Sequence, residues 1–472
     1  MRMLFKVSNS DLYGGYDQEK MKQKFIEESV LLVSILKWFV LATGIGVVVG
    51  LSTTLFLKFL YWSVTTTNGY PYYFLLLPLG FFLSSLIIHH VEPDARGYGT
   101  EKVIEAVHKR FGKMNFRVVP IKLAATIITA AAGGSIGQIG PCAQIGAALS
   151  SFLGHAFKLD DNDVKKLVIC GISAGFASVL GSPIAGAIFG VEVLFVGGIM
   201  YEVLLPSFIA GITSYQISSW LGIHYIYYPV KFIPPFSETF FFQVVVSGIF
   251  FGLCAIMLIE TMRMGERLSG RLSIWPPLKG IVGGVLLIGL TFIFSPAYLG
   301  LGIETIQASL RGEQIVLYAF LVKALFTSIS FGAGGSGGII TPILFVGATA
   351  GSLFGDIAGL DKATFAAIGL VSVLAGAANT PIAASILAME LMGQEIAPYA
   401  AVACVVSFLM TGHRGIFTTQ LLYVKKSSSV EVEVGTDLEG LKTRFNPREK
   451  SVSGMLIKLV SRARKIKRKN GD

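Results

Sequence analysis

Two glycine-rich segments, each closed by a proline, contain the residues of this sequence that are best suited to binding a ligand. The first reads Gly-Gly-Ser-Ile-Gly-Gln-Ile-Gly-Pro over residues 133–141, and the second ends in Gly-Gly-Ile-Ile-Thr-Pro over residues 337–342. Proline is favoured in the first turn of a helix, so each segment predicts a helix that starts near its proline. Glycines leave the backbone N–H groups uncovered at this positive end of the helix dipole. Each segment therefore predicts an anion site without a charged side chain.

The two segments together indicate more than either one alone. For a single segment, glycines that permit tight packing between membrane helices are the simpler interpretation. Two helix N-termini directed at one point would stabilise a partly dehydrated halide without holding it as tightly as a lysine or arginine. We therefore interpret the pair as one anion site built from backbone N–H groups.

The chain repeats itself over its two halves. Gly-Ser-Pro-Ile-Ala around Pro183 matches Asn-Thr-Pro-Ile-Ala around Pro381, and these prolines lie 198 residues apart (381 − 183). The prolines that close the glycine-rich segments lie 201 residues apart (342 − 141). Chance similarity between glycine- and alanine-rich helices explains two matches at nearly equal spacing less well than a duplication does. In membrane transport proteins, such a duplication commonly places a binding site where broken helices of the two halves meet.

The composition predicts an all-α polytopic membrane protein. Of the 472 residues, 53% are hydrophobic and only 14% are charged, and the mean hydropathy is +0.67. Uncharged stretches at 38–57, 73–88, 240–259 and 280–294 approach or reach the roughly 20 residues that span hydrocarbon. We therefore expect the lipid bilayer of the cell membrane as the solvent of this chain, crossed several times.

Three regions follow from the distribution of charge. Residues 1–30 mix acidic and basic side chains, unlike a cleaved signal peptide, and are predicted to be a retained cytoplasmic segment. Residues 31–424 form the predicted transmembrane domain, with halves at about 31–220 and 235–424. Residues 425–472 are predicted to be a basic cytoplasmic tail by the positive-inside tendency. The basic cluster of this tail could contact anionic lipid headgroups or simply be solvated.

Other classes of function have weaker support. No nucleic-acid recognition module accompanies the net charge of +10, so nucleic acid is not an expected partner. The four cysteines lie in apolar segments without Cys-x-x-Cys spacing, which argues against a disulfide framework and a metal site. No organic cofactor is expected. Gly-Gly-Ser-Gly at 334–337 matches the serine motif of rhomboid intramembrane proteases, with His413 downstream. Such a match arises by chance in a chain rich in glycine and serine, so no enzyme is expected.

Four motifs in order resemble the CLC family of chloride channels and chloride/proton exchangers. Residues 137–141, Gly-Gln-Ile-Gly-Pro, resemble the Gly-Arg-Glu-Gly-Pro motif of the family, and residues 338–342, Gly-Ile-Ile-Thr-Pro, resemble its Gly-x-Phe-x-Pro motif. Residues 97–101, Gly-Tyr-Gly-Thr-Glu, are similar to its Gly-Ser-Gly-Ile-Pro motif. Phe417 falls where the family places a pore tyrosine. The resemblance covers residues 31–424.

This resemblance implies a homodimer with one anion path in each subunit, built from two inverted halves of tilted, partly broken helices. It implies bound chloride ions. The regulatory CBS domains of the family are not expected, because only 48 residues (472 − 424) follow residue 424. The anion-binding residues that it implies are Tyr98, Gly99, Ile139, Gly140, Ile339, Ile340, Thr341 and Phe417.

Two departures from the family pattern bear on mechanism. The gating glutamate of the family aligns with Ile139, and the internal proton glutamate of its exchangers aligns with Val193. Proton coupling needs a group that titrates, and neither side chain does. The sequence therefore predicts passive, proton-uncoupled movement of chloride or a similar small anion. A chloride/proton antiporter that uses other titratable groups, and a non-conducting relative that binds an anion, are the alternatives.

The role of Tyr98 and the identity of the ion stay open. Tyr98 could supply the hydroxyl that Phe417 lacks, could block the path, or could simply pack. Chloride is the expected ion by resemblance, while nitrate, bromide and fluoride stay open.

Four charged residues in apolar segments also allow alternatives. Glu192 and Glu390 occupy matched places near predicted helix ends, where capping of nearby backbone is favoured over proton transfer. Lys122 and Lys323 could raise the positive potential near the path or extend to a membrane interface.

Overall fold

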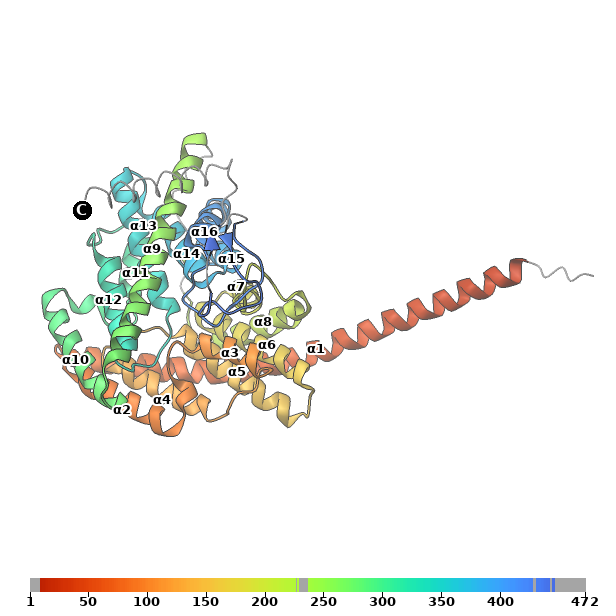
Figure 1. The fold of residues 1–472 in the computed structure, drawn as a ribbon, viewed down its shortest axis with the longest axis horizontal. Helices are drawn as coiled ribbons and strands as arrows, with labels where there is room; N and C mark the ends of the chain where they lie inside the picture. The colour runs from red at the N-terminus through yellow and green to blue at the C-terminus, as the bar shows by residue number, and fades with distance from the viewer. Residues whose placement is uncertain (1–8, 226, 229–236, 428–429, 442–443, 446–472) are drawn as a thin grey trace, which may run out of the picture.

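Helices form almost the whole protein. The computed structural model describes residues 9–225, 227–228, 237–427, 430–441 and 444–445. The helices are α1 Asn9–Asn68, α2 Leu77–Val91, α3 Thr100–Lys109, α4 Val118–Ala131, α5 Ile139–Ala156, α6 Asp161–Leu180, α7 Pro183–Glu192, α8 Leu204–Trp220, α9 Glu238–Arg271, α10 Pro276–Ile293, α11 Ile303–Leu310, α12 Ala319–Gly332, α13 Ile340–Ala358, α14 Lys362–Ala378, α15 Pro381–Met392 and α16 Ala397–Thr411. Short 3-10 turns lie at Tyr73–Leu76, Pro93–Ala95, Tyr201–Val203, Pro296–Tyr298 and Gln394–Ile396. In Figure 1, the N-terminal turns of α1 extend away from a body made by the other helices.

The structure confirms a multi-pass membrane protein. Among the described residues, six helical segments are long and apolar enough to cross a bilayer: Gln23–Asn68, Tyr73–Val91, Glu238–Arg271, Pro276–Ile293, Ile340–Ala358 and Gln394–Thr411. All four uncharged stretches identified in the sequence lie largely within these segments. Many of their exposed side chains are large and apolar, as lipid contact requires.

Several other helices are too short to cross the hydrocarbon core. Helix α7 has 10 residues and α15 has 12, which corresponds to about 15–18 Å at the usual helical rise. The hydrocarbon core is about 30 Å thick. These elements are the partly broken helices that the sequence predicted. They are buried mainly among other helices, where their backbone ends find polar partners.

The same elements occur in the same order in both halves. Helix α5 packs along α6 through Gly146 and Gly171, where a β-carbon on Gly146 would lie 2.4 Å from the Gly171 carbonyl oxygen. Helix α13 packs along α14 through Gly347 and Gly369 at the same 2.4 Å. The glycines inside these helices are therefore required by close backbone contact. Helices α5 and α13 begin two residues before Pro141 and Pro342, slightly earlier than the proline rule predicts.

Two carboxylates join the halves reciprocally. Glu192, at the end of α7, accepts hydrogen bonds from the backbone N–H groups of Ile382 and Ala383 at 3.0 and 2.8 Å. Glu390, near the end of α15, accepts bonds from Ile184 and Ala185 at the same two distances. Each carboxylate caps the first turn of the matched helix in the other half. The capping interpretation of these glutamates is thus confirmed.

Short strands attach the end of the chain to the helical body. Strand β1, Phe195–Val196, pairs in parallel with β2, Leu421–Leu422, and β3, Val430–Glu431, pairs antiparallel with β4, Arg444–Phe445. Val432 packs with Val196 and Leu422 in a small buried cluster. Part of the predicted tail therefore folds against the body. The basic residues that end the chain lie outside the described residues.

Removal of the Glu192 carboxylate should destabilise the protein. We expect Glu192→Ala to lower the free energy of unfolding by about 1.5–3 kcal/mol, because two buried N–H groups lose a charged acceptor. Glu390 is more exposed than Glu192, so Glu390→Ala should cost less. The measurement is thermal unfolding in detergent, with Glu395→Ala as the control because Glu395 is exposed. Equal unfolding temperatures for Glu192→Ala and Glu395→Ala would contradict the capping role.

Candidate anion-binding site

The two glycine-rich segments meet inside the protein. Gly137 and Gly338 form an antiparallel bridge in which each N–H donates to the other carbonyl, at 2.6 and 2.7 Å. A β-carbon on Gly140 would lie 2.9 Å from the Gly338 Cα. The starts of α5 and α13 therefore converge at one buried point and do not face lipid. The antiparallel bridge also fits the inverted arrangement of the two halves.

Serine and threonine side chains hold these two segments from the opposite half. Ser135 of the first segment contacts α12, where its hydroxyl lies 2.9 Å from the Thr327 hydroxyl and its N–H donates to the Ser330 hydroxyl. Ser336 of the second segment contacts α4, where its N–H donates to the Thr129 hydroxyl at 3.2 Å. These bonds satisfy backbone groups that lie outside any helix and thereby fix the crossing.

A third segment from the first half lies against the crossing. Gly99 precedes α3 with φ of +84°, a conformation that favours glycine. The Tyr98 carbonyl oxygen would lie 2.1 Å from a β-carbon on Gly140, so the loop of Tyr98 and Gly99 rests directly on the start of α5. Contact at this distance explains why Gly140 carries no side chain.

Two fully buried lysines hold this loop and its counterpart. The Lys122 ammonium donates to the carbonyl oxygens of Ala95 at 3.1 Å and Gly97 at 2.7 Å. The Lys323 ammonium donates to two carbonyl oxygens of the matched loop, at 3.1 and 2.9 Å. Both side chains are 0% exposed, so the interpretation that they extend to a membrane interface is wrong. Their charge is directed at backbone carbonyl groups.

These lysines reveal a repeat that the sequence analysis missed. Residues 97–101 read Gly-Tyr-Gly-Thr-Glu, and residues 300–304 read Gly-Leu-Gly-Ile-Glu. In both segments the second glycine has positive φ and caps a short helix, α3 or α11. The separation of 203 residues (300 − 97), close to that of the glycine-rich segments, was the signal that could have found them.

The residues predicted to bind an anion are all buried, and most lie close to the crossing. Ile139 and Ile340 are the first residues of α5 and α13, and Ile339 precedes α13. Phe417 is 0% exposed, and the Glu101 carboxylate accepts bonds from the N–H and hydroxyl of the adjoining Thr418, at 3.1 and 2.8 Å. Glu101 was not singled out in the sequence, although it is the last residue of the Gly-Tyr-Gly-Thr-Glu segment.

Val193, the other position aligned with a family glutamate, lies at the end of α7. Its carbonyl oxygen accepts a bond from the Gln420 side chain at 2.8 Å. Gln420 also donates to the Ala378 carbonyl oxygen at 2.8 Å. Val193 thus helps to anchor the segment that follows Phe417, and its apolar side chain is buried.

Two cavities lie next to this crossing and share no lining residue. The tyrosine-side cavity, of about 540 Å³, is lined by Tyr98, Glu101 and Glu266 among others. The isoleucine-side cavity, of about 350 Å³, is lined by Ile139 and Thr341 among others. The buried residues Gly99, Ile340 and Phe417, which we call the central layer, line neither cavity. The two cavities are therefore separate and do not form one open path in this structure.

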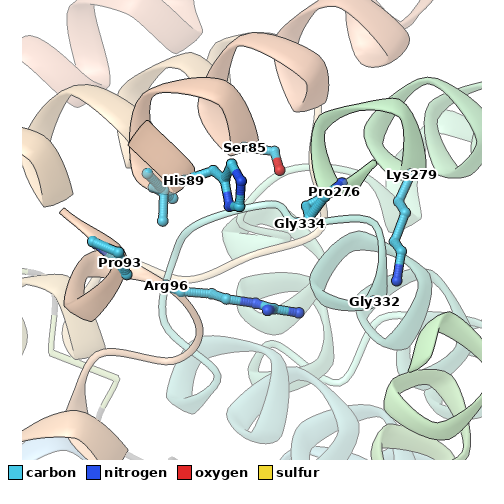
Figure 2. Close-up of a pocket in the computed structure, with 9 residues that line it drawn as sticks. Ser85, His89, Pro93, Arg96, Pro276, Lys279, Gly332 and Gly334 are labelled. Carbon is cyan, nitrogen blue, oxygen red and sulfur yellow. The ribbon is translucent and has the colours of Figure 1, made fainter. Parts of the chain in front are cut away.

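Basic side chains surround a smaller pocket beside the tyrosine-side cavity. This pocket, of about 110 Å³, is lined by His89, Arg96 and Lys279, and it shares Arg96, Lys279 and Gly332 with the larger cavity. Figure 2 shows the Arg96 and Lys279 side chains approaching the turn at Gly332 from two sides. Two cations at the edge of a cavity raise the local concentration of anions.

The Tyr98 side chain is held by residues of the second half. Its hydroxyl donates to the Glu266 carboxylate at 2.6 Å. Its ring meets Phe331 edge-on, with centroids 4.7 Å apart. A phenol has one hydrogen to donate, so in this conformation Tyr98 offers none to an anion.

Thr341 presents the opposite case. Its hydroxyl is buried beside Gly137 and lacks a hydrogen-bond partner within the described part of the chain. Buried hydroxyl groups normally have a partner, because leaving one unpaired costs about 1–3 kcal/mol. Thr341 is the second residue of α13 and lines the isoleucine-side cavity. An unpaired donor at this place suits an anion that enters from this cavity.

With this geometry in hand, comparison with known proteins identifies the family. A family profile described as "Voltage gated chloride channel" matches residues 80–412. The chain belongs to the CLC chloride channel family. A "Chloride/fluoride channel protein" of Pseudomonas syringae pv. tomato is 35% identical over 401 residues, which cover 84% of this chain and 88% of that protein.

Solved CLC structures have the same fold. The crystal structure of a CLC-type fluoride/proton antiporter matches with a TM-score of 0.78 and 26% identity, covering 82% of this chain and 98% of that one. A slow cyanobacterial Cl⁻/H⁺ antiporter matches with a TM-score of 0.71 at 20% identity, which supports the fold alone. The CLC resemblance and the all-α fold of inverted halves predicted from the sequence are confirmed.

The CLC fold leaves no serine–histidine pair at the rhomboid-like motif. The buried Ser336 hydroxyl lies 3.4 Å from the Ala95 carbonyl oxygen. His413 instead accepts a bond from the Lys426 N–H at 3.2 Å. Within the described residues, no hydrogen bond joins Ser336 to His413, so the arrangement needed to activate the serine is not formed.

Substitution of Gly140 should disturb the crossing. We expect Gly140→Ala to lower the free energy of unfolding by about 1–3 kcal/mol, because the new methyl group overlaps the Tyr98 carbonyl group. Gly44→Ala in α1 is a matched control, since a β-carbon there would meet nothing within 4 Å. Thermal unfolding of both variants in detergent compares them. Equal stability of the two variants would show that the contact between α5 and the Tyr98 loop is looser than described.

Proposed function

We propose that this CLC protein provides a passive path for small inorganic anions, with no coupled movement of protons. The main support is the buried meeting of two helix N-termini at Gly137 and Gly338. The N–H groups in the first turns of α5 and α13, which start two residues after these glycines, and the positive ends of the two helix dipoles favour an anion beside the crossing. This is the physical reason to assign anion movement to a site that contains no cationic side chain.

The absence of a carboxylate from the first turn of α5 supports uncoupled movement. Ile139 lines the isoleucine-side cavity at the start of α5, where it can neither bind a proton nor compete with an anion. The named residues of the central layer, which are Gly99, Ile340 and Phe417, also carry no acidic group. An anion that crosses this layer therefore has no titratable partner there with which to exchange.

A chloride/proton or fluoride/proton antiporter is the second candidate. Glu101 and Glu266 are among the four glutamates that line the tyrosine-side cavity, and Glu266 is bonded to Tyr98. The solved structure that is 26% identical to this chain is that of a fluoride/proton antiporter. In this alternative, protons would enter from the tyrosine side and reach the anion path through Tyr98 and not through residue 139.

Chloride is the ion we propose first, with fluoride as the competing ion. The curated relative at 35% identity is named a chloride/fluoride channel protein. Thr341 adds a hydroxyl donor at the isoleucine side, and donors bind small, charge-dense halides more strongly than large ones. We further propose that the protein functions as a homodimer, with both termini in the cytoplasm.

Liposomes that contain the purified protein test passive movement directly. Loaded with potassium chloride and diluted into a chloride-poor buffer, they should release chloride only when valinomycin carries potassium as the counter-charge. Parallel loading with potassium fluoride, followed with a fluoride-selective electrode, compares the two halides. Protein-free liposomes are the control. Absence of chloride and fluoride release would favour the non-conducting, anion-binding alternative.

A pH electrode in the same experiment separates the two candidates. Passive movement predicts that a chloride gradient drives no uphill proton flux. The antiporter predicts such a flux, and predicts that it disappears in Glu266→Gln. An uphill flux of protons in the wild-type protein would therefore overturn the uncoupled proposal.

The Thr341 hydroxyl should contribute to halide binding. We expect Thr341→Val to raise the halide concentration for half-maximal flux by about fivefold, since one hydrogen bond is lost while shape is kept. Thr341→Ser should retain the wild-type value. Thr349→Val is a matched control in the same helix, because the Thr349 hydroxyl already donates to the Phe345 carbonyl oxygen at 2.8 Å. If Thr341→Val and Thr349→Val gave the same half-maximal concentration, the hydroxyl would not bind the ion.

A further inference from the structure

Tyr98 connects the two halves at the end of the tyrosine-side cavity. Its backbone lies on Gly140 at the start of α5, while its ring and hydroxyl contact Phe331 of α12 and Glu266 of α9. The Tyr98 side chain is only 4% exposed although it lines the cavity. The buried Tyr98 thus forms part of the cavity wall next to the start of α5.

Glu266 has a fixed position because α9 packs closely on α12. A β-carbon on the neighbouring Gly265 would lie 2.1 Å from the Ser328 hydroxyl oxygen, so only glycine permits this approach. The Ser328 hydroxyl donates to the Thr261 carbonyl oxygen at 2.7 Å, and the Ser269 hydroxyl donates to the Gly332 carbonyl oxygen at 2.6 Å. Contacts on both sides of Glu266 thus hold this part of α9 against the end of α12.

No cationic partner explains the presence of the Glu266 carboxylate among the described residues. In the part of the chain that the structure describes, it forms no ion pair, and its hydrogen bond is the one from Tyr98. An anionic side chain at the end of an anion path repels the ions that approach it. A carboxylate here is therefore unfavourable for simple conduction, and its bond to the ring that covers the path points to control of access.

We propose that Glu266 is a gating residue on the tyrosine side, which holds the Tyr98 ring across the end of the path. This inference rests on the proposed anion movement and adds the residue that limits it. When the bond between the hydroxyl and the carboxylate breaks, the ring swings toward the cavity and an anion reaches the start of α5. The cavity of about 540 Å³ has room for the displaced ring.

Two single variants and their combination test this gate in the liposome assay. Tyr98→Phe keeps the ring and removes the bond, and Glu266→Ala removes the acceptor while keeping the Tyr98 hydroxyl. Each should raise the rate of halide release by about fivefold, the change expected for the loss of one hydrogen bond. The double variant should be no faster than either single variant, because both remove the same interaction.

A control separates the bond from a general effect of negative charge. Glu105 lines the same cavity and pairs with Lys102 at 3.0 Å, without contact to Tyr98. Glu105→Gln should change the rate by less than about twofold, because partly exposed charges are screened by water and salt. A rise in Glu105→Gln equal to that in Glu266→Ala would overturn the gate in favour of simple repulsion.

The outcomes also distinguish this gate from the proposed function. If the wild-type protein conducts and neither single variant is faster than the wild type, the proposed anion movement stands and the gate is rejected. A fall in rate for Tyr98→Phe alone would show that the hydroxyl binds the ion instead. If neither the wild type nor any variant conducts, the proposed function fails and the gate fails with it. Should Glu266→Ala not fold, as judged by gel filtration, Tyr98→Phe alone still decides.

Discussion

The close approach of two backbones at Gly137 and Gly338 is the constraint on which the rest of the structure depends. A β-carbon at Gly137, Gly140 or Gly338 would lie within 3.0 Å of backbone or side-chain atoms of another segment. The proposed anion site is therefore made of main chain, because no side chain fits between the helix starts. The consequence is a site that attracts negative charge through dipoles and holds it weakly.

This constraint is met by interactions that occur in reciprocal pairs. The N–H groups at each helix start need hydrogen-bond acceptors, which the hydrocarbon of the bilayer does not supply. The other half of the chain provides these acceptors. Glu192 caps α15 while Glu390 caps α7, and two buried lysines hold the two loops that precede α3 and α11. The two halves differ at the residue to which we assign the gate. Tyr98 in the first half corresponds to Leu301 in the second, so a gate of the proposed type can form on one side only.

Much of the fold could be predicted from the sequence, because proline and glycine occur at specific places such as helix starts and close helix contacts. Pro141 and Pro342 predicted helix starts to within two residues, and the duplication predicted that these starts meet. The contacts of Tyr98 could not be predicted in the same way. Its partner Glu266 lies 168 residues further along the chain, in an amphipathic end of α9 that carries no motif. Likewise, the sequence left two interpretations open for Lys122 and Lys323, a positive potential near the path or extension to a membrane interface. It could not show that each ammonium group binds two backbone carbonyl oxygens inside the protein.

Reciprocal capping has a consequence for how the protein is made. The start of α7 is synthesised with its N–H groups unsatisfied, and the carboxylate that caps it lies more than 200 residues later in the chain. An unpaired N–H group in hydrocarbon is unfavourable. The start of α7 is therefore expected to stay in contact with water or with a chaperone until α15 has been translated. We therefore expect the first half to reach its final structure only after α15 has been synthesised, and a truncated chain that ends before residue 390 to be a substrate for membrane quality control.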